Sequence, residues 1–184
     1  MTEDKRLASF YERGSSSYTA LLKDAEKALK KTIEENPQDA EALALYGTVN
    51  GWLITSTWSG MRRGPRADKS YKKAREADPK NPRVAMLQGT SRLFRPGAFG
   101  GGVDKAESEL TEALALFDQE PRDKPWPNGG HAEIYTWMGQ VMVKKGDFHQ
   151  ARTFYDQALA LEPNYRWVTE ILLPELDAAL SQSH

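Results

Sequence analysis

Apolar and small residues recur every three to four positions along most of the chain, and this spacing predicts amphipathic helices. The pattern is clearest between Ala132 and Tyr165, where such residues fall at Tyr135, Met138, Gly139, Met142, Ala151, Tyr155 and Ala158. Gly146 and Asp147 interrupt the pattern, and Pro163 ends it. Since proline lacks a backbone N–H and disfavours helical geometry in the residue before it, this window predicts two helices joined by a tight turn.

Two small residues, Gly139 and Ala151, occupy the positions where this predicted hairpin closes. Helix axes must come within about 8–10 Å of each other there, which small side chains permit. Tyr155 and Ala158 follow Ala151 at helical spacing and continue the buried stripe of the second helix.

The spacing of residues 132–165 resembles the tetratricopeptide repeat (TPR) at every signature position. The same spacing returns upstream in two stretched copies, whose matching residues are Leu43, Tyr46, Gly47, Ala67, Tyr71, Ala74 and Pro79, then Ala85, Gln88, Gly89, Ala106, Leu110 and Ala113. A degenerate first copy shows a clear second helix through Ala25, Leu29 and Thr32, with its first helix expected within Lys5–Ser17. The resemblance implies an all-α fold, a right-handed solenoid of antiparallel helix hairpins with a C-terminal capping helix.

These repeats fill the chain, so we expect a single domain over residues 1–184. Its parts are a degenerate hairpin at 1–38, stretched repeats at 39–80 and 81–118, a regular repeat at 131–164, and a capping helix at 165–184. Ala67 follows Gly47 by 20 positions, against 12 between Gly139 and Ala151, so we expect residues 54–64 to lengthen the second hairpin and its turn.

The connections between the later helices are also irregular. We expect a tight glycine-rich turn at residues 95–102, and a long loop at 118–130 whose Trp126 tucks against neighbouring repeats. The cap is expected to bury Trp167, Ile171, Leu172, Leu176 and Ala179, and Pro174 should kink it or restart it.

Charge is balanced over the whole chain, with a net charge of −1, which gives no overall electrostatic reason to bind nucleic acid or a membrane. It is nevertheless uneven, because residues 62–83 hold nine Lys or Arg against three Asp or Glu. We treat five of these cations as a possible basic patch: Arg62, Arg63, Arg66, Lys69 and Lys73. One interpretation is a solvated helix face, and the other is a surface that attracts an acidic protein or anionic lipid.

No pattern in the sequence predicts catalysis, a cofactor or a metal site. Cysteine is absent, which excludes disulfides and thiolate ligands. His131, His149 and His184 are widely scattered, and we expect them on the solvated surface. The glycine-rich turn lacks the lysine and hydroxyl residue of a phosphate-binding loop, so a plain connection between helices is favoured over an anion site.

In TPR proteins the first helices of the hairpins line a concave groove, so the resemblance predicts which residues here would face a partner. They are Trp52, Thr48, Arg83, Met86, Leu87, Thr90, Phe94, Trp137 and Gln140. We expect the aromatic residues to anchor a peptide or protein partner and Arg83, Thr90 and Gln140 to orient it. The competing interpretation is that Trp52, Phe94 and Trp137 only pack between repeats.

The leading hypothesis is therefore a non-catalytic scaffold that holds a protein partner. The stretched repeats also resemble a divergent bacterial TPR group that includes helper subunits of solute uptake systems. This finer resemblance gives the alternative, an accessory transport or envelope subunit that encloses a small ligand. No apolar run has the length of a membrane span, and the start of the sequence lacks a signal core. The expected location is thus the cytoplasm, or the periplasm if a signal peptide has been removed.

Overall fold

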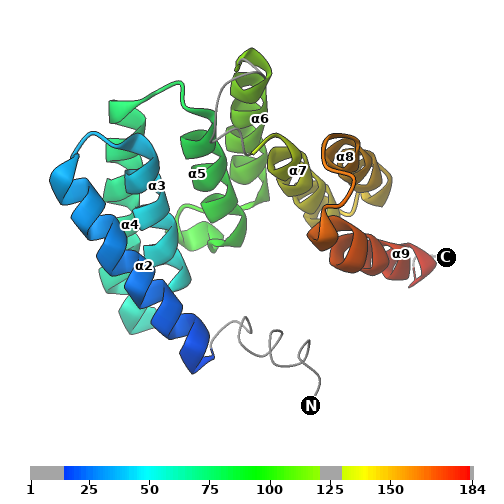
Figure 1. Ribbon diagram of the computed structural model, residues 1–184. Helices are drawn as coiled ribbons and strands as arrows, with labels where there is room; N and C mark the ends of the chain where they lie inside the picture. The colour runs from blue at the N-terminus through cyan, green and yellow to red at the C-terminus, as the bar shows by residue number, and fades with distance from the viewer. Residues whose placement is uncertain (1–14, 121–129, 183–184) are drawn as a thin grey trace. The chain divides into compact units, whose positions relative to one another are not determined.

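The computed structural model describes residues 15–120 and 130–182, and over these residues the chain is built from helices without any strand (Figure 1). The helices are α2 (Ser16–Glu35), α3 (Ala40–Trp52), α4 (Thr57–Ala77), α5 (Pro82–Phe94), η1 (Gly97–Phe99), α6 (Val103–Gln119), α7 (His131–Lys145), α8 (Phe148–Leu161), η2 (Trp167–Leu172) and α9 (Leu173–Gln182). The chain divides into two compact units, residues 1–79 and 80–184, so the expected single domain stays a prediction. Each unit is described by itself.

In the first unit, α3 and α4 form a hairpin and α2 packs on α3 (Figure 1). Helix α2 is the second helix predicted for the degenerate first copy, while residues 5–14 of its predicted partner lie outside the described residues. Ser15 starts α2, because its side chain accepts a hydrogen bond from the backbone N–H of Tyr18. Leu22, Val49 and Leu53 form an apolar cluster where α2 meets α3.

The extra residues of the second hairpin lengthen a helix and leave the turn short. Only residues 53–56 separate α3 from α4, and α4 extends over 57–77 with Pro65 inside it. Ser56 and Ser59 cap its start reciprocally, each side chain accepting from the other's backbone N–H. The predicted longer turn is therefore wrong, because this capping pair lets the helix begin soon after Trp52.

In the second unit, α5 pairs with α6 and α7 pairs with α8, as the repeat spacing predicts. Their shared core contains Leu110, Phe117, Ile134, Val141 and Tyr155, all almost fully buried. The small residue at position 139 is required by this packing. A Cβ built on Gly139 would lie 2.3 Å from a ring carbon of Tyr155.

The chain reverses direction tightly between α5 and α6, and the glycines of this turn allow the backbone geometry that the reversal needs. Gly100 and Gly102 have positive φ angles of 81° and 123°, and a Cβ on Gly101 would lie 2.0 Å from the carbonyl oxygen of Arg95. Asp104 falls in the first turn of α6, which suits the helix dipole. The expected tight connection is confirmed. Helix α6 continues through Gln119, so the loop expected at 118–130 begins later, and Trp126 lies outside the described residues.

The C-terminal cap consists of the π-helical segment η2 followed by α9. Val168, Leu172 and Leu176 form its buried stripe, whereas Ile171 is 49% exposed. A π turn holds more residues than an α turn, so it rotates Ile171 away from the core and the prediction for this residue is wrong. Pro174 lies in the first turn of α9, where the missing N–H is tolerated. The chain changes there from π-helix to α-helix without a break, so Pro174 marks a change of helix type where a kink or a restart was expected.

Candidate functional site

Four aromatic side chains of the second unit contact one another in sequence, from α5 across α7 to the start of the cap. We call Phe94, Trp137, Trp167 and Tyr165 the aromatic row. The ring centroids are 5.9 Å apart from Phe94 to Trp137, 5.0 Å from Trp137 to Trp167, and 6.3 Å from Trp167 to Tyr165. The interplanar angles lie between 62° and 82°, the edge-to-face geometry that aromatic pairs favour.

The row remains partly open to solvent, and polar groups hold its rings in place. Phe94 is 48% exposed, and the other three rings are half-buried. The indole N–H of Trp137 donates to Glu133 Oε1 at 3.2 Å, one helical turn earlier. Lys144 Nζ stands 5.7 Å from the centre of the Phe94 ring, within cation–π range. A set of fixed, half-exposed rings can bind a ligand with little loss of side-chain entropy.

Tyr165 closes the row beside α7. Burial, together with the nearby carboxylates of Glu133 and Glu162, raises the pKa of its hydroxyl to about 12, while a hydrogen bond with Thr136 acts in the opposite direction. The phenol therefore stays neutral at physiological pH and can both donate and accept a hydrogen bond.

The structure places the nine predicted groove residues in different environments. Trp52 and Thr48 belong to the first unit and the other seven to the second. Three aromatic residues are accessible: Trp52 is 43% exposed, Phe94 is 48% exposed, and Trp137 is half-buried. Leu87 and Gln140 are also half-buried. The remaining four are buried: Thr48, Arg83, Met86 and Thr90.

Arg83 is held by its own unit. Its guanidinium makes a bidentate pair with the Glu120 carboxylate at 2.9 Å and 3.0 Å, and it lies over the Phe117 ring at 5.6 Å. The two charged side chains are only 10% and 7% exposed. The sequence predicts that Arg83 orients a ligand, whereas the geometry gives it a structural partner at the end of α6.

Gly47, Gly89 and Gly139 occupy the same position on the first helices of the three hairpins. The residue that follows each glycine is therefore also equivalent. The Thr48 hydroxyl lies 2.8 Å from the Tyr71 hydroxyl, and Gln140 Nε2 donates to the Tyr155 hydroxyl at 2.6 Å. In the hairpin between them along the chain, Thr90 takes this position, but the second helix carries the apolar Leu110 where the others have tyrosine.

Thr90 is consequently a buried hydroxyl that finds no hydrogen-bond partner among the residues the structure describes. Leaving such a group unpaired costs about 1–3 kcal/mol. Thr90 precedes Phe94 by one helical turn, so this hydroxyl lies on the same face of α5 as the end of the aromatic row. The sequence itself shows why this hydroxyl lacks a partner, because leucine stands at position 110 where the other two hairpins have tyrosine.

Sequence reasoning missed two members of the row. Trp167 is predicted to be a buried residue of the cap, and Tyr165 carries no predicted role. Their positions soon after the helix-ending Pro163 place them where the chain turns back towards α7, as the ring contact with Trp137 shows. Tyr165 lies in the irregular connection before η2, and the helical spacing that includes Trp167 does not show which ring it meets.

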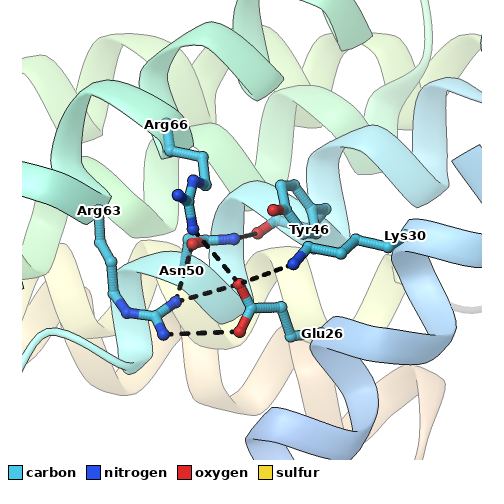
Figure 2. A network of polar contacts seen from close by, with 6 residues as sticks. All are labelled: Glu26, Lys30, Tyr46, Asn50, Arg63 and Arg66. Atoms are coloured by element: carbon cyan, nitrogen blue, oxygen red, sulfur yellow. Dashed lines mark hydrogen bonds and ion pairs between the residues drawn. The ribbon is translucent and has the colours of Figure 1, made fainter.

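The basic patch divides into engaged and exposed cations (Figure 2). Arg63 lies against Glu26 at 3.2 Å and donates to Asn50 Oδ1 at 2.9 Å, while Arg66 and Lys30 approach the same carboxylate at 3.6 Å and 4.0 Å. Glu26 is only 8% exposed. The remaining three patch members project into solvent: Arg62, Lys69 and Lys73.

His131 departs from its predicted environment. Its ring lies 4.9 Å from the Phe117 ring and its Nε2 is 3.3 Å from the Phe117 carbonyl oxygen, so it packs at the start of α7 and is not a solvated surface histidine. Within residues 15–120 and 130–182, no three His, Cys, Asp or Glu side chains gather closely enough to hold a metal ion.

Comparison with known proteins supports the interpretation of these hairpins as helical repeats. Residues 132–165, which form nearly all of α7, the whole of α8 and the start of the connection to the cap, match the model of the tetratricopeptide repeat family. This segment is a tetratricopeptide repeat. The same window carries Gly139, Tyr155 and Pro163, the residues that shape the hairpin. Tetratricopeptide repeats generally act as non-catalytic scaffolds for protein interactions, and the chain has the fold of such a helical repeat scaffold.

A solved structure extends the similarity beyond one repeat. A thermophilic TPR protein of Thermus thermophilus superimposes with a TM-score of 0.65, at 20% sequence identity, over 88% of this chain and 74% of that chain. At this identity the likeness concerns the fold alone. No curated protein shows a significant match in sequence. Among the described helices, none is long and apolar enough to cross a membrane.

Proposed function

We propose that this TPR-containing protein binds a peptide segment of a protein partner on the aromatic row. The observation that carries this proposal is the continuous line of partly exposed rings from Phe94 to Tyr165. Such a line offers apolar area at its rings and polar atoms at its edges, which is the composition of binding hot spots.

The hydroxyl of Thr90 supports the same proposal. This buried hydroxyl gains a hydrogen bond if binding opens the packing around it and the ligand supplies an acceptor. A peptide backbone carbonyl is an acceptor of this kind. Gln140 stands on α7 beside the row and is half-buried, so its amide can assist in orienting the same ligand.

Isothermal titration with a peptide selected on the full chain from a displayed peptide library tests the proposal. Truncating Phe94 or Trp137 to alanine should weaken binding by about 2 kcal/mol or more, roughly thirtyfold. Phe94 has nearly half of its surface exposed, so its removal should leave the unfolding temperature little changed.

Ile171→Ala provides the matched control, because Ile171 is equally exposed on the same unit but lies outside the row. If Ile171→Ala weakens the selected peptide as much as Phe94→Ala does, or if neither row variant affects it, the row is not the binding site. The alternative, a transport or envelope subunit that encloses a small ligand, stays a prediction. If such a ligand binds at the aromatic row, a small solute should displace the selected peptide.

A further inference from the structure

An open pocket of about 250 Å³ lies on the first unit, in contact with all three of its described helices. Its lining residues are Lys30, Ile33 and Glu34 of α2, Leu43 and Tyr46 of α3, and Arg66, Lys69, Ser70 and Lys73 of α4. Because every lining residue belongs to the first unit, this pocket shares no residue with the aromatic row of the second.

The pocket has an apolar floor and a cationic rim. Ile33, Leu43 and Tyr46 supply the floor, with Leu43 only 3% exposed. Four cationic side chains stand around it against one carboxylate, that of Glu34. The combination differs from an ordinary solvated helix face, where charges of both signs alternate over polar surroundings.

The positive charge of the rim is only partly neutralised. Figure 2 shows Lys30 and Arg66 directed towards Glu26, but Arg63 approaches the same carboxylate more closely than either. Lys69 and Lys73 are exposed, and neither makes an ion pair with any residue that the structure describes. The Glu26 carboxylate is therefore shared by Arg63, Arg66 and Lys30. Lys69 and Lys73, the other two cations of the rim, have no anionic partner among the described residues.

The arrangement of these cations along α4 follows one helix face. Arg62, Arg66, Lys69 and Lys73 are separated by four, three and four positions, the spacing that places side chains in a single row. Like charges at this spacing repel one another and destabilise the helix. An anion bound at the pocket would attract each of these cations and so offset their mutual repulsion.

We propose that the pocket binds an acidic peptide segment in which a hydrophobic side chain lies between carboxylates. The hydrophobic side chain covers Tyr46 and Ile33, and the carboxylates pair with Lys69, Lys73 and Lys30. The volume is below the range of about 300–1,000 Å³ that is usual for pockets enclosing whole small ligands, and it suits a side chain or two. A nucleic-acid backbone has anions but nothing apolar to cover the floor.

Fluorescence anisotropy with the full chain tests this inference. The probe is a fluorescein-labelled peptide Glu-Glu-Leu-Phe-Glu-Glu, compared with Gln-Gln-Leu-Phe-Gln-Gln and Glu-Glu-Ser-Ser-Glu-Glu. We expect the first peptide to bind most tightly, and its affinity to fall as salt rises from about 0.05 M to about 0.3 M.

The Lys69→Glu/Lys73→Glu variant should weaken this binding at least about tenfold, since two charge-assisted contacts become repulsive. Both lysines are exposed, so circular dichroism should show an unchanged fold. Lys69→Arg/Lys73→Arg retains the charges and should retain the affinity. Lys72→Glu/Lys105→Glu alters the net charge equally at exposed positions outside the pocket and should have little effect.

Three outcomes would overturn the proposal. They are equal binding of all three peptides, equal weakening by the Lys72→Glu/Lys105→Glu control, or binding of phosphatidylserine vesicles but not of the acidic peptide. The last outcome would assign the rim to an anionic membrane surface. Phe94→Ala should leave this acidic probe unaffected, so failure of the pocket and failure of the aromatic row are distinguishable.

Discussion

The hydroxyls of Thr48 and Tyr71 lie 2.8 Å apart and join the two helices of the first unit's hairpin. Gln140 and Tyr155 make the equivalent bond at 2.6 Å in the regular repeat. The hairpin of α5 and α6 keeps the polar residue, Thr90, but replaces the tyrosine with Leu110. The same position is thus a structural bond in two hairpins and an unsatisfied hydroxyl in the third.

This contrast predicts opposite results for one chemical change at two sites. Thr48→Val should lower the free energy of unfolding by about 1 kcal/mol, because it removes a buried hydrogen bond. Thr90→Val should leave it unchanged or raise it by up to about 1 kcal/mol, because the lost hydroxyl has no partner in the described part of the chain. Urea denaturation of both variants measures the difference. A clear loss of stability in Thr90→Val would show that this hydroxyl is satisfied in the folded protein.

Thr90→Val also separates stability from binding. If its hydroxyl bonds a ligand, the variant should bind the peptide selected on the wild-type protein about 1 kcal/mol more weakly, roughly fivefold, without any loss of fold. Titration calorimetry on the same sample as the urea experiment measures both quantities. Unchanged affinity would remove Thr90 from the proposed site while leaving the aromatic row to be tested by Phe94→Ala.

The closure of the α7–α8 hairpin depends on the absence of a side chain at Gly139. Gly139→Ala should destabilise the protein by about 1–3 kcal/mol, because the added methyl group would overlap the fully buried Tyr155 ring. Gly51 in α3 is the matched control, since a Cβ there meets nothing within 4 Å. Gly51→Ala should instead stabilise by about 0.5–1 kcal/mol through helix propensity. Thermal unfolding that shows the same sign for both variants would contradict this account.

The ion pair of Arg83 and Glu120 is predicted to be sensitive to the loss of either partner. Glu120→Gln should cost about 3 kcal/mol, because the Arg83 charge remains buried without its carboxylate. Replacing both residues by Met and Leu should recover much of this loss. Glu76→Gln should change stability little, since the pair of Lys72 and Glu76 is largely exposed at 78% and 63%. Chemical denaturation of the wild type and these three variants measures the effects. Equal losses of stability for Glu120→Gln and Glu76→Gln would show that the pair of Arg83 and Glu120 is not buried in the folded protein.

Tyr165 should make stability depend on pH in the alkaline range. Its folded-state pKa of about 12 exceeds the ordinary value of 10.0, mainly because of burial. Above the ordinary value the unfolded chain loses this proton first, so stability is complete below about pH 10 and falls as pH rises towards 12. Tyr165→Phe should flatten that fall, and urea midpoints across this range measure it. An unchanged slope would mean that Tyr165 titrates normally in the folded protein.

The sequence by itself determined the helices and their pairing. Gly139, Ala151, Tyr155 and Pro163 stand at fixed helical spacing, so local periodicity was sufficient to predict the α7–α8 hairpin. The stretched copies were predictable for the same reason. Where the prediction was wrong, at the turn before α4 and at Ile171, a capping pair of serines and a π turn changed the local geometry in ways that simple periodicity does not contain.

Only the tertiary structure decided which side chains stand opposite one another. Periodicity places Arg83 and Arg63 on a face of a helix, but their carboxylate partners, Glu120 and Glu26, lie 37 positions away along the chain. The meeting of Trp137 with Trp167 likewise depends on an irregular segment between α8 and the cap. Helical spacing fixes the direction of a side chain from its own axis. What it meets there depends on how neighbouring helices pack, which local sequence does not encode.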